Sequence, residues 1–328
     1  MMELEQYMLP MTTSLEKLAL ECTTDVGDSR KRGALLDPRK NIVMSNRFVV
    51  GLEQGSRFAQ KLTRIAIGQI PMDAEELPTI VITSKDVEAM GLTKQRLTGH
   101  MDAVLDEILS YRIKLAAVDR IQREAKLTGI NVFAQATIIP GKGAIAVKLN
   151  PMLKEHFLGL RENFTQYSLS VALKLPGYAS IKLHELLLSR SRKYHTQVIR
   201  FHIEDLMAIL NYKPSKEGGG SPSNFVNSTV KRAVQNINES TESYVEYKCL
   251  TNGRRLQDIR FYVDSSFKSI DEKQEYWRAI QEFRAGEPIT SDSFTREDIM
   301  QNTLWIEEQL LYGEDELCLE DIPTGPAK

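Results

Sequence analysis

The strongest signal in the chain is the stretch Asn224-Phe-Val-Asn-Ser-Thr-Val-Lys-Arg-Ala-Val-Gln-Asn-Ile-Asn238. Its apolar residues recur at the spacing of an α-helix, which places them on one face. They are Val226, Val230, Ala233, Val234 and Ile237. The opposite face carries only amide, hydroxyl and basic side chains: Asn224, Asn227, Ser228, Lys231, Arg232, Gln235 and Asn238. We therefore expect an amphipathic helix whose polar face has no carboxylate before Glu239.

Such a polar face is typical of a helix that lies in the major groove of DNA. Arginine and lysine donate hydrogen bonds to guanine, and asparagine and glutamine form paired hydrogen bonds with adenine. The simpler interpretation is a solvated helix surface. Because solvated faces usually mix glutamate with lysine, the missing carboxylates favour DNA recognition.

A β-hairpin is predicted directly after this helix. Two strands, Tyr244–Leu250 and Gln257–Val263, flank Thr251-Asn-Gly-Arg-Arg255, in which Asn-Gly is a strong turn signal. Three basic side chains lie in or near the turn, where they suit contacts with phosphates or with the minor groove. They are Lys248, Arg254 and Arg255.

The elements that precede the helix complete a known order. The sequence predicts a helix at Tyr178–Arg190, a strand at Gln197–Phe201 and a short helix at Ile203–Leu210. A helix-turn-helix followed by a β-hairpin is the element order of a winged helix. We therefore expect a winged-helix domain within residues 151–268.

The same order of elements occurs once more, earlier in the chain. The predicted elements are a strand at Ile42–Met44, helices at Ser56–Ile70, Lys85–Met90 and Thr93–Leu109, a strand at Thr79–Ile82, and hairpin strands at Ile130–Ile139 and Ala144–Leu149. Because chance would have to produce the order twice, the repetition is stronger evidence for winged helices than either copy alone. The predicted fold class is α+β, with two tandem winged-helix domains and a helical, acidic C-terminal tail.

Two sets of residues in the first unit are candidates for further DNA contacts. Lys94, Gln95 and Arg96 begin the longer predicted helix, and Lys142 lies at the tip of the hairpin. Acidic residues follow later in that helix, so a protein interface fits this surface equally well. We expect domain 42–150 to provide dimerisation and secondary DNA contacts, and domain 151–268 to provide most of the recognition.

The two ends of the chain differ from the body. Residues 1–41 are expected to form a flexible arm, whose basic cluster at 30–40 is either a linker or a DNA contact. Residues 269–328 are expected to form a tail with helices at Lys273–Phe283 and Thr295–Leu311. The formal charge is about +8 over residues 1–268 and about −10 over residues 269–328, so a polyanion partner suits the body.

No pattern in the sequence indicates an enzyme. There is no Walker-type phosphate loop, and the five histidines never show the spacing of metal ligands. His184 is expected on a helix surface or at the edge of the core. We predict no catalytic residue, metal or cofactor. Three distant cysteines and the lack of a secretory signal or an apolar span indicate a cytoplasmic protein.

Several segments resemble the iteron-binding plasmid replication initiator (Rep) family. They are Leu149-Asn-Pro-Met-Leu-Lys-Glu-His-Phe-Leu158, Tyr178-Ala-Ser-Ile-Lys-Leu-His-Glu-Leu-Leu187, Phe225-Val-Asn-Ser-Thr-Val-Lys-Arg-Ala-Val-Gln-Asn-Ile-Asn238, and Gly253-Arg-Arg255. The resemblance implies tandem winged helices that bind direct repeats at a plasmid origin. It further implies that monomers open the origin and recruit host helicase proteins, and that dimers repress the initiator's own promoter. Glu53-Gln-Gly-Ser-Arg57 departs from the family's usual Leu-Ser-x-x-Glu-x-Arg-like helix start.

The sequence is also compatible with two other functions. A winged-helix transcription regulator would bind a palindrome without direct repeats beside its gene. A nicking replication enzyme would cleave DNA with a divalent metal and a tyrosine, and it normally needs a His-x-His pair, which this sequence lacks.

Overall fold

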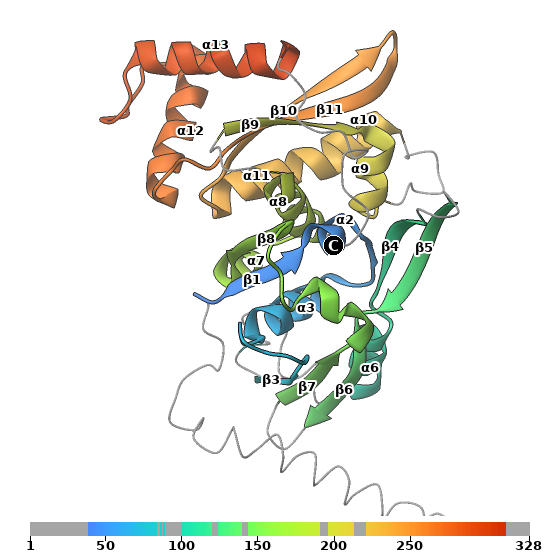
Figure 1. The fold of residues 1–328 in the computed structure, drawn as a ribbon. Helices are drawn as coiled ribbons and strands as arrows, with labels where there is room; N and C mark the ends of the chain where they lie inside the picture. Colours follow the sequence, from blue (N-terminus) through green and yellow to red (C-terminus); the bar gives the residue numbers. More distant parts are fainter. Residues whose placement is uncertain are drawn as a thin grey trace, which may run out of the picture.

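The structure is a computed structural model that describes residues 39–83, 86, 88, 100–119, 124–139, 144–190, 196–212 and 221–312. Two halves meet at a central layer (Figure 1). In this layer, strand β1 (Asn41–Ser45) pairs antiparallel with β8 (Phe164–Ser168), although more than a hundred residues separate them. The beginnings of the two predicted units therefore lie side by side.

Each central strand leads into a short helix through a serine cap. Ser45 Oγ accepts a hydrogen bond from Phe48 N, 3.2 Å away, at the start of α2 (Asn46–Val50). Ser168 Oγ accepts one from Ser170 N, also 3.2 Å away, at the start of α7 (Leu169–Lys174). Such caps satisfy backbone N–H groups that a helix start leaves free. A helix of 13 residues then follows in each half: α3 (Arg57–Gln69) and α8 (Tyr178–Arg190).

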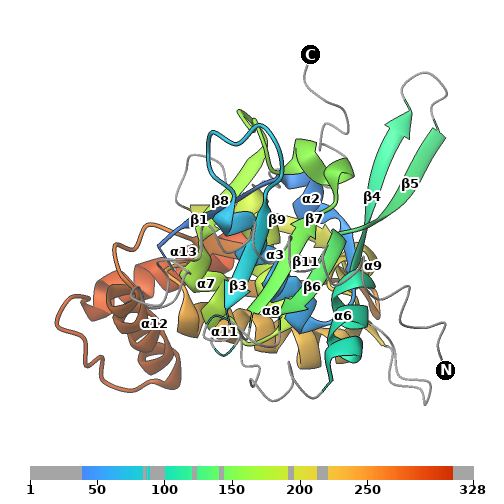
Figure 2. The ribbon, with the colours of Figure 1, turned by 90° about the horizontal axis from the view of Figure 1, so that it is seen from below.

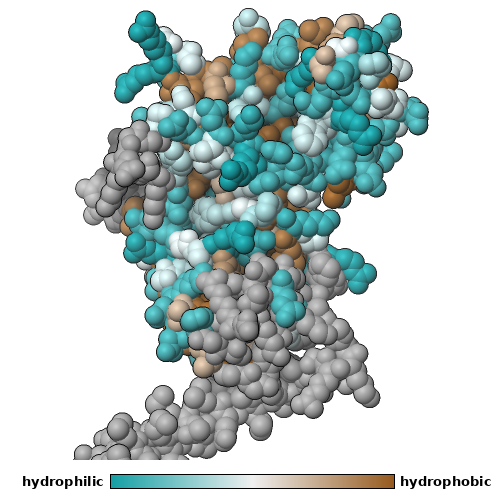
Figure 3. Space-filling model, turned by 180° about the vertical axis from the view of Figure 1, so that it is seen from behind, coloured by the Kyte–Doolittle hydropathy of each residue, from teal (hydrophilic) through white to brown (hydrophobic). Residues whose placement is uncertain are grey.

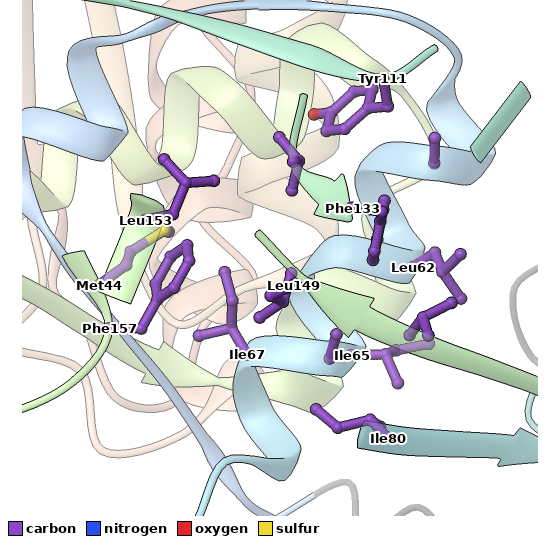
Figure 4. Packing of buried hydrophobic residues seen from close by; sticks show 14 of the residues in the cluster. Met44, Leu62, Ile65, Ile67, Ile80, Tyr111, Phe133, Leu149, Leu153 and Phe157 are labelled. Carbon is purple, nitrogen blue, oxygen red and sulfur yellow. The ribbon is translucent and has the colours of Figure 1, made fainter. Parts of the chain in front are cut away.

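In the first half, α3 and α6 (Met101–Leu109) share one hydrophobic core with a three-stranded antiparallel sheet. The sheet order is β6 (Phe133–Ile139), β7 (Ala144–Leu149), β3 (Thr79–Thr83). Alternate residues of β3 point inward, and α3 contributes several side chains to the same core (Figure 4). The predicted helix 56–70 and strand 79–82 are thus confirmed. The predicted helix 85–90 and the start of helix 93–109 lie largely outside the described residues.

A second hairpin in this half was not predicted. Strands β4 (Arg112–Asp119) and β5 (Glu124–Asn131) pair with each other, and β4 also pairs with β2 (Leu52–Gln54). The hairpin projects from the body (Figures 1 and 2). The single strand predicted at 130–139 is therefore wrong, because the chain leaves β5 at Val132 before it enters β6. Val132 N donates to the Tyr111 carbonyl instead, at 2.8 Å.

The second half contains the predicted helices and strands. They are β9 (Thr196–His202), α9 (Ile203–Ile209), α10 (Pro222–Phe225), a π-helical turn (Val226–Val230), α11 (Lys231–Ser240), β10 (Tyr244–Asn252) and β11 (Arg255–Asp264). The sheet order β10-β11-β9 repeats that of β6-β7-β3, because in each half the preceding strand pairs with the second strand of the hairpin.

Helix α8 lies in the middle of the molecule (Figure 1), and side chains all around it are buried. His184 is one of them, with 4% of its surface exposed, and its ring contacts Tyr167 edge-on. The expectation that His184 lies on a helix surface or at the core edge is therefore wrong. Burial lowers the pKa of His184 to about 4.

The helices predicted in the C-terminal region are present as α12 (Ile270–Ala285) and α13 (Arg296–Tyr312). They cover one face of the second sheet, where Tyr244 and Tyr262 share a hydrophobic cluster with Tyr276 and Ile306. The Lys273 ammonium is buried and donates to the Asn238 carbonyl and, at 2.7 Å, to the Thr241 carbonyl. These two helices and the sheet therefore form one packed unit.

Candidate nucleic-acid interface

The helix predicted at 224–238 extends from Pro222 to Ser240 and contains one π-helical turn. Ser221 caps it by accepting a hydrogen bond from Asn224 N at 3.2 Å, and Pro222 suits the first turn because it lacks an N–H group. The five predicted apolar residues are all buried: Val226, Val230, Ala233, Val234 and Ile237. They pack on α8, β10 and β11 in the hydrophobic core of the second half.

The predicted polar face is exposed at six of its seven positions. The exposed residues are Asn224, Asn227, Ser228, Lys231, Arg232 and Gln235. They present amide, hydroxyl, ammonium and guanidinium groups along the helix, and the sequence has no carboxylate from 222 to 238. Figure 3 shows that hydrophilic side chains also dominate the described surface on the back of the molecule.

Asn238 is the exception, because it is 4% exposed. Its side-chain amide donates to the Val245 carbonyl and accepts from Val245 N, both at 2.8 Å. This pair of hydrogen bonds joins the end of α11 to the start of β10. The assignment of Asn238 to the exposed face is therefore wrong, since the inward side of the last helical turn holds it.

Two local hydrogen bonds shape the exposed face. The Ser228 hydroxyl donates to the Asn224 carbonyl at 2.6 Å, which leaves its oxygen free to accept. The Gln235 amide donates to Glu239 at 2.8 Å, so the first carboxylate fixes the far end of the face. The π-helical turn between α10 and α11 is a feature often found at functional sites. No signal in the sequence predicted it.

The hairpin β10–β11 places its turn beyond the same end of the sheet as α10 (Figure 1). Arg254 and Arg255 are exposed at this turn, and Lys248 is half-buried farther along β10. Gly253 adopts a φ of 61°, a left-handed conformation that favours glycine in a tight turn. The turn thus carries two adjacent guanidinium groups into solvent.

The candidate residues of the first unit are not placed by the structure. Lys94, Gln95, Arg96 and Lys142 lie outside the described residues. The unpredicted strand β4 adds other basic side chains, the exposed Arg112 and the half-buried Lys114, which alternate with the buried Ile113 and Leu115. This alternation is a strand signal that could have been used.

Within the described parts of the chain, no group of three or more His, Cys, Asp or Glu side chains could hold a metal ion. The helices described here are also not long and apolar enough to cross a bilayer.

Residues 41–188 match the family model described as initiator replication protein, WH1. Over these residues, the chain is similar to the initiator replication protein family. The matched residues include the first half of the molecule and most of α8, and they fit a winged-helix domain in an α+β fold.

A solved structure has a similar fold over most of the chain. It is the crystal structure of Pi initiator protein in complex with iteron DNA, with a TM-score of 0.56 and 17% sequence identity. The match covers 70% of this chain and 98% of that chain. At this identity the likeness shows the fold, and it extends well beyond the family match, since residues 41–188 are less than half of the chain.

Proposed function

We propose that this protein is a plasmid replication initiator that binds direct repeats at the origin through two tandem winged-helix domains. The observation that carries the proposal is the exposed face of α10–α11, which offers base-reading groups and no carboxylate before Glu239. The initiator family match and the similar fold of an initiator bound to iteron DNA support it.

The tandem arrangement is supported by repeated structure. Both halves begin with a strand that ends in a capping serine, followed by a short helix and a 13-residue helix. Both then form a three-stranded sheet with the same strand order. We infer domain 42–150 as the dimerisation and secondary DNA domain, domain 151–268 as the main recognition domain, and 1–41 and 269–328 as arm and tail.

In this proposal, the recognition helix contacts base edges and the hairpin contacts the DNA backbone. Lys231 and Arg232 are suited to guanine, and Asn227 and Gln235 to adenine. Arg254 and Arg255 are suited to phosphates or the minor groove, and Lys248 lies farther along β10. In the first domain, Lys94, Gln95, Arg96 and Lys142 would add contacts. Binding needs no catalytic chemistry of the protein's own.

The proposed biological setting follows from this activity. The protein acts on plasmid DNA in the bacterial cytoplasm, where monomers open the origin and recruit host replication proteins. Homodimers repress the initiator's own promoter. A transcription regulator without a replication role remains the alternative, and a palindrome without direct repeats beside the gene favours it.

Fluorescence anisotropy with labelled repeat DNA tests the recognition helix. Arg232→Ala is expected to weaken specific binding by about 1–3 kcal/mol if the guanidinium contacts a base. Arg278→Ala is the matched control, because Arg278 is exposed on α12, away from this face. Equal affinities for wild type, Arg232→Ala and Lys231→Ala would remove the recognition-helix assignment.

A further inference from the structure

Four fully buried charged side chains lie where the two halves meet. They are Glu53 on β2, Arg64 on α3, and Lys182 and Glu185 on α8. Arg64 donates to both carboxylates: Nη1 and Nη2 lie 3.0 and 2.7 Å from Glu53, and Nε and Nη2 lie 2.8 and 2.6 Å from Glu185. Lys182 Nζ donates to Glu53 at 2.6 Å. The formal charges of the cluster cancel.

Tyrosine hydroxyl groups complete the cluster. Tyr111 donates to Glu53, and Tyr167 donates to Glu185. The Tyr178 hydroxyl donates to the Glu53 carbonyl at 3.0 Å. Each of the four carboxylate oxygens therefore accepts at least one hydrogen bond. Although burial raises the pKa of Glu53, the cations Arg64 and Lys182 outweigh it and hold that pKa at about 2, so Glu53 is ionised.

The cluster joins equivalent positions of the two repeated halves. Arg64 is the eighth residue of the 13 in α3, and Glu185 is the eighth residue of the 13 in α8. Further polar contacts surround it: Lys61 Nζ donates to the Leu173 carbonyl at 2.8 Å, and Asn46 Nδ2 donates to the Ser189 carbonyl at 3.1 Å. The interface between the halves thus contains hydrogen bonds of defined geometry as well as apolar contacts.

Stability alone is a poor explanation for such a cluster. Removing charges from water is unfavourable, and apolar side chains of similar volume often stabilise a protein equally well. Paired hydrogen bonds differ from apolar contacts in their geometry, because the guanidinium fork meets a carboxylate in one plane and at fixed distances. A sliding or rotated interface would leave buried charges unpaired, whereas an apolar interface tolerates such shifts.

We propose that Glu53, Arg64, Lys182 and Glu185 act as positioning residues that fix the orientation of the two winged helices and thereby set the spacing of DNA sites that the protein accepts. The proposal rests on the proposed function, in which both domains contact one duplex. Each inserted base pair moves the second site by about 3.4 Å and rotates it by about 35°. A rigid pair of domains cannot follow that displacement and loses one set of contacts.

The experiment compares binding to repeats of altered length. Footprinting first locates the stretches that each half protects, and one or two base pairs are then inserted between them. Fluorescence anisotropy measures affinity for wild type and for the variant Glu53→Leu/Arg64→Met/Lys182→Met/Glu185→Leu. Wild type is expected to lose at least about tenfold in affinity per insertion. The variant is expected to bind all spacings within about threefold of one another.

Arg64→Lys provides a second variant, because it keeps the charge but not the fork, and intermediate discrimination is expected from it. It also serves where the quadruple variant fails to show cooperative unfolding by circular dichroism. A folded variant that discriminates spacings as strongly as wild type overturns the proposal and leaves the proposed function intact. A wild-type protein that binds every spacing equally, or shows no specific binding, contradicts the two-domain function itself.

Discussion

Helices α8 and α11 pack against each other, and they use their charged side chains in opposite ways. Helix α11 buries its apolar stripe and exposes Lys231 and Arg232. Helix α8 buries Lys182 and Glu185 together with its leucines. A charged residue in a helix is therefore not always exposed. It can be buried where another segment brings a partner of opposite charge close to it.

The buried charges of α8 are expected to make the largest contribution to stability. Glu185→Ala leaves Arg64 without one of its two carboxylates in a fully buried site, and we expect it to lower the free energy of unfolding by about 3–5 kcal/mol. The matched change Glu239→Ala on the exposed side of α11 should alter it by less than about 0.5 kcal/mol. Urea unfolding measures both, and similar values for the two variants would contradict the assigned burial.

His184 provides a second test of α8 through pH. Because the folded state holds its pKa at about 4, below the ordinary value of 6.5, the unfolded state binds more protons between these values. The free energy of unfolding should therefore fall by about 3 kcal/mol as pH drops from 6.5 to 4. Burial also lowers the pKa of His156, so the His184 contribution is read from the difference between wild type and His184→Gln. Equal slopes of unfolding free energy against pH in the two proteins would exclude a contribution from His184.

Two asparagines in α10–α11 are expected to have different roles, one in stability and one in DNA binding. Asn238→Ala removes both hydrogen bonds to Val245, so it should lower the free energy of unfolding by about 1–3 kcal/mol. Asn227→Ala should leave stability unchanged and weaken binding to repeat DNA by about 1–3 kcal/mol, if Asn227 pairs with a base. Thermal unfolding and anisotropy separate the two effects, and a stability loss for Asn227→Ala would argue against an exposed reading face.

The smallest expected effect concerns the β10–β11 turn. Arg255→Ala should weaken binding to all DNA sequences by a similar factor, because phosphate contacts carry little sequence information. The slope of log affinity against log salt concentration should become shallower by about one. The exposed Arg278 on α12 again supplies the control, and a change of sequence preference in Arg255→Ala would assign this turn to base reading.

Local patterns in the sequence determined the second half of the molecule well. Apolar spacing placed Val226 through Ile237 on one buried face, and Asn252-Gly253 placed the hairpin turn. The same reasoning missed β4 and β5, and it placed Asn238 on the wrong side of the last turn. In the first unit, the candidate residues Lys94, Gln95, Arg96 and Lys142 stay predictions.

In the second half, the sequence by itself determined closely where helices and strands begin and end, because caps, turns and apolar periods act between residues a few positions apart. Tertiary structure alone decided which charged side chains are buried, since Glu53 and Lys182 pair across 129 positions of the chain. It also decided the pairing of β1 with β8 and the packing of α12 and α13 on the second sheet. The physical reason is that burying a charge depends on a distant partner, which no local pattern of residues records.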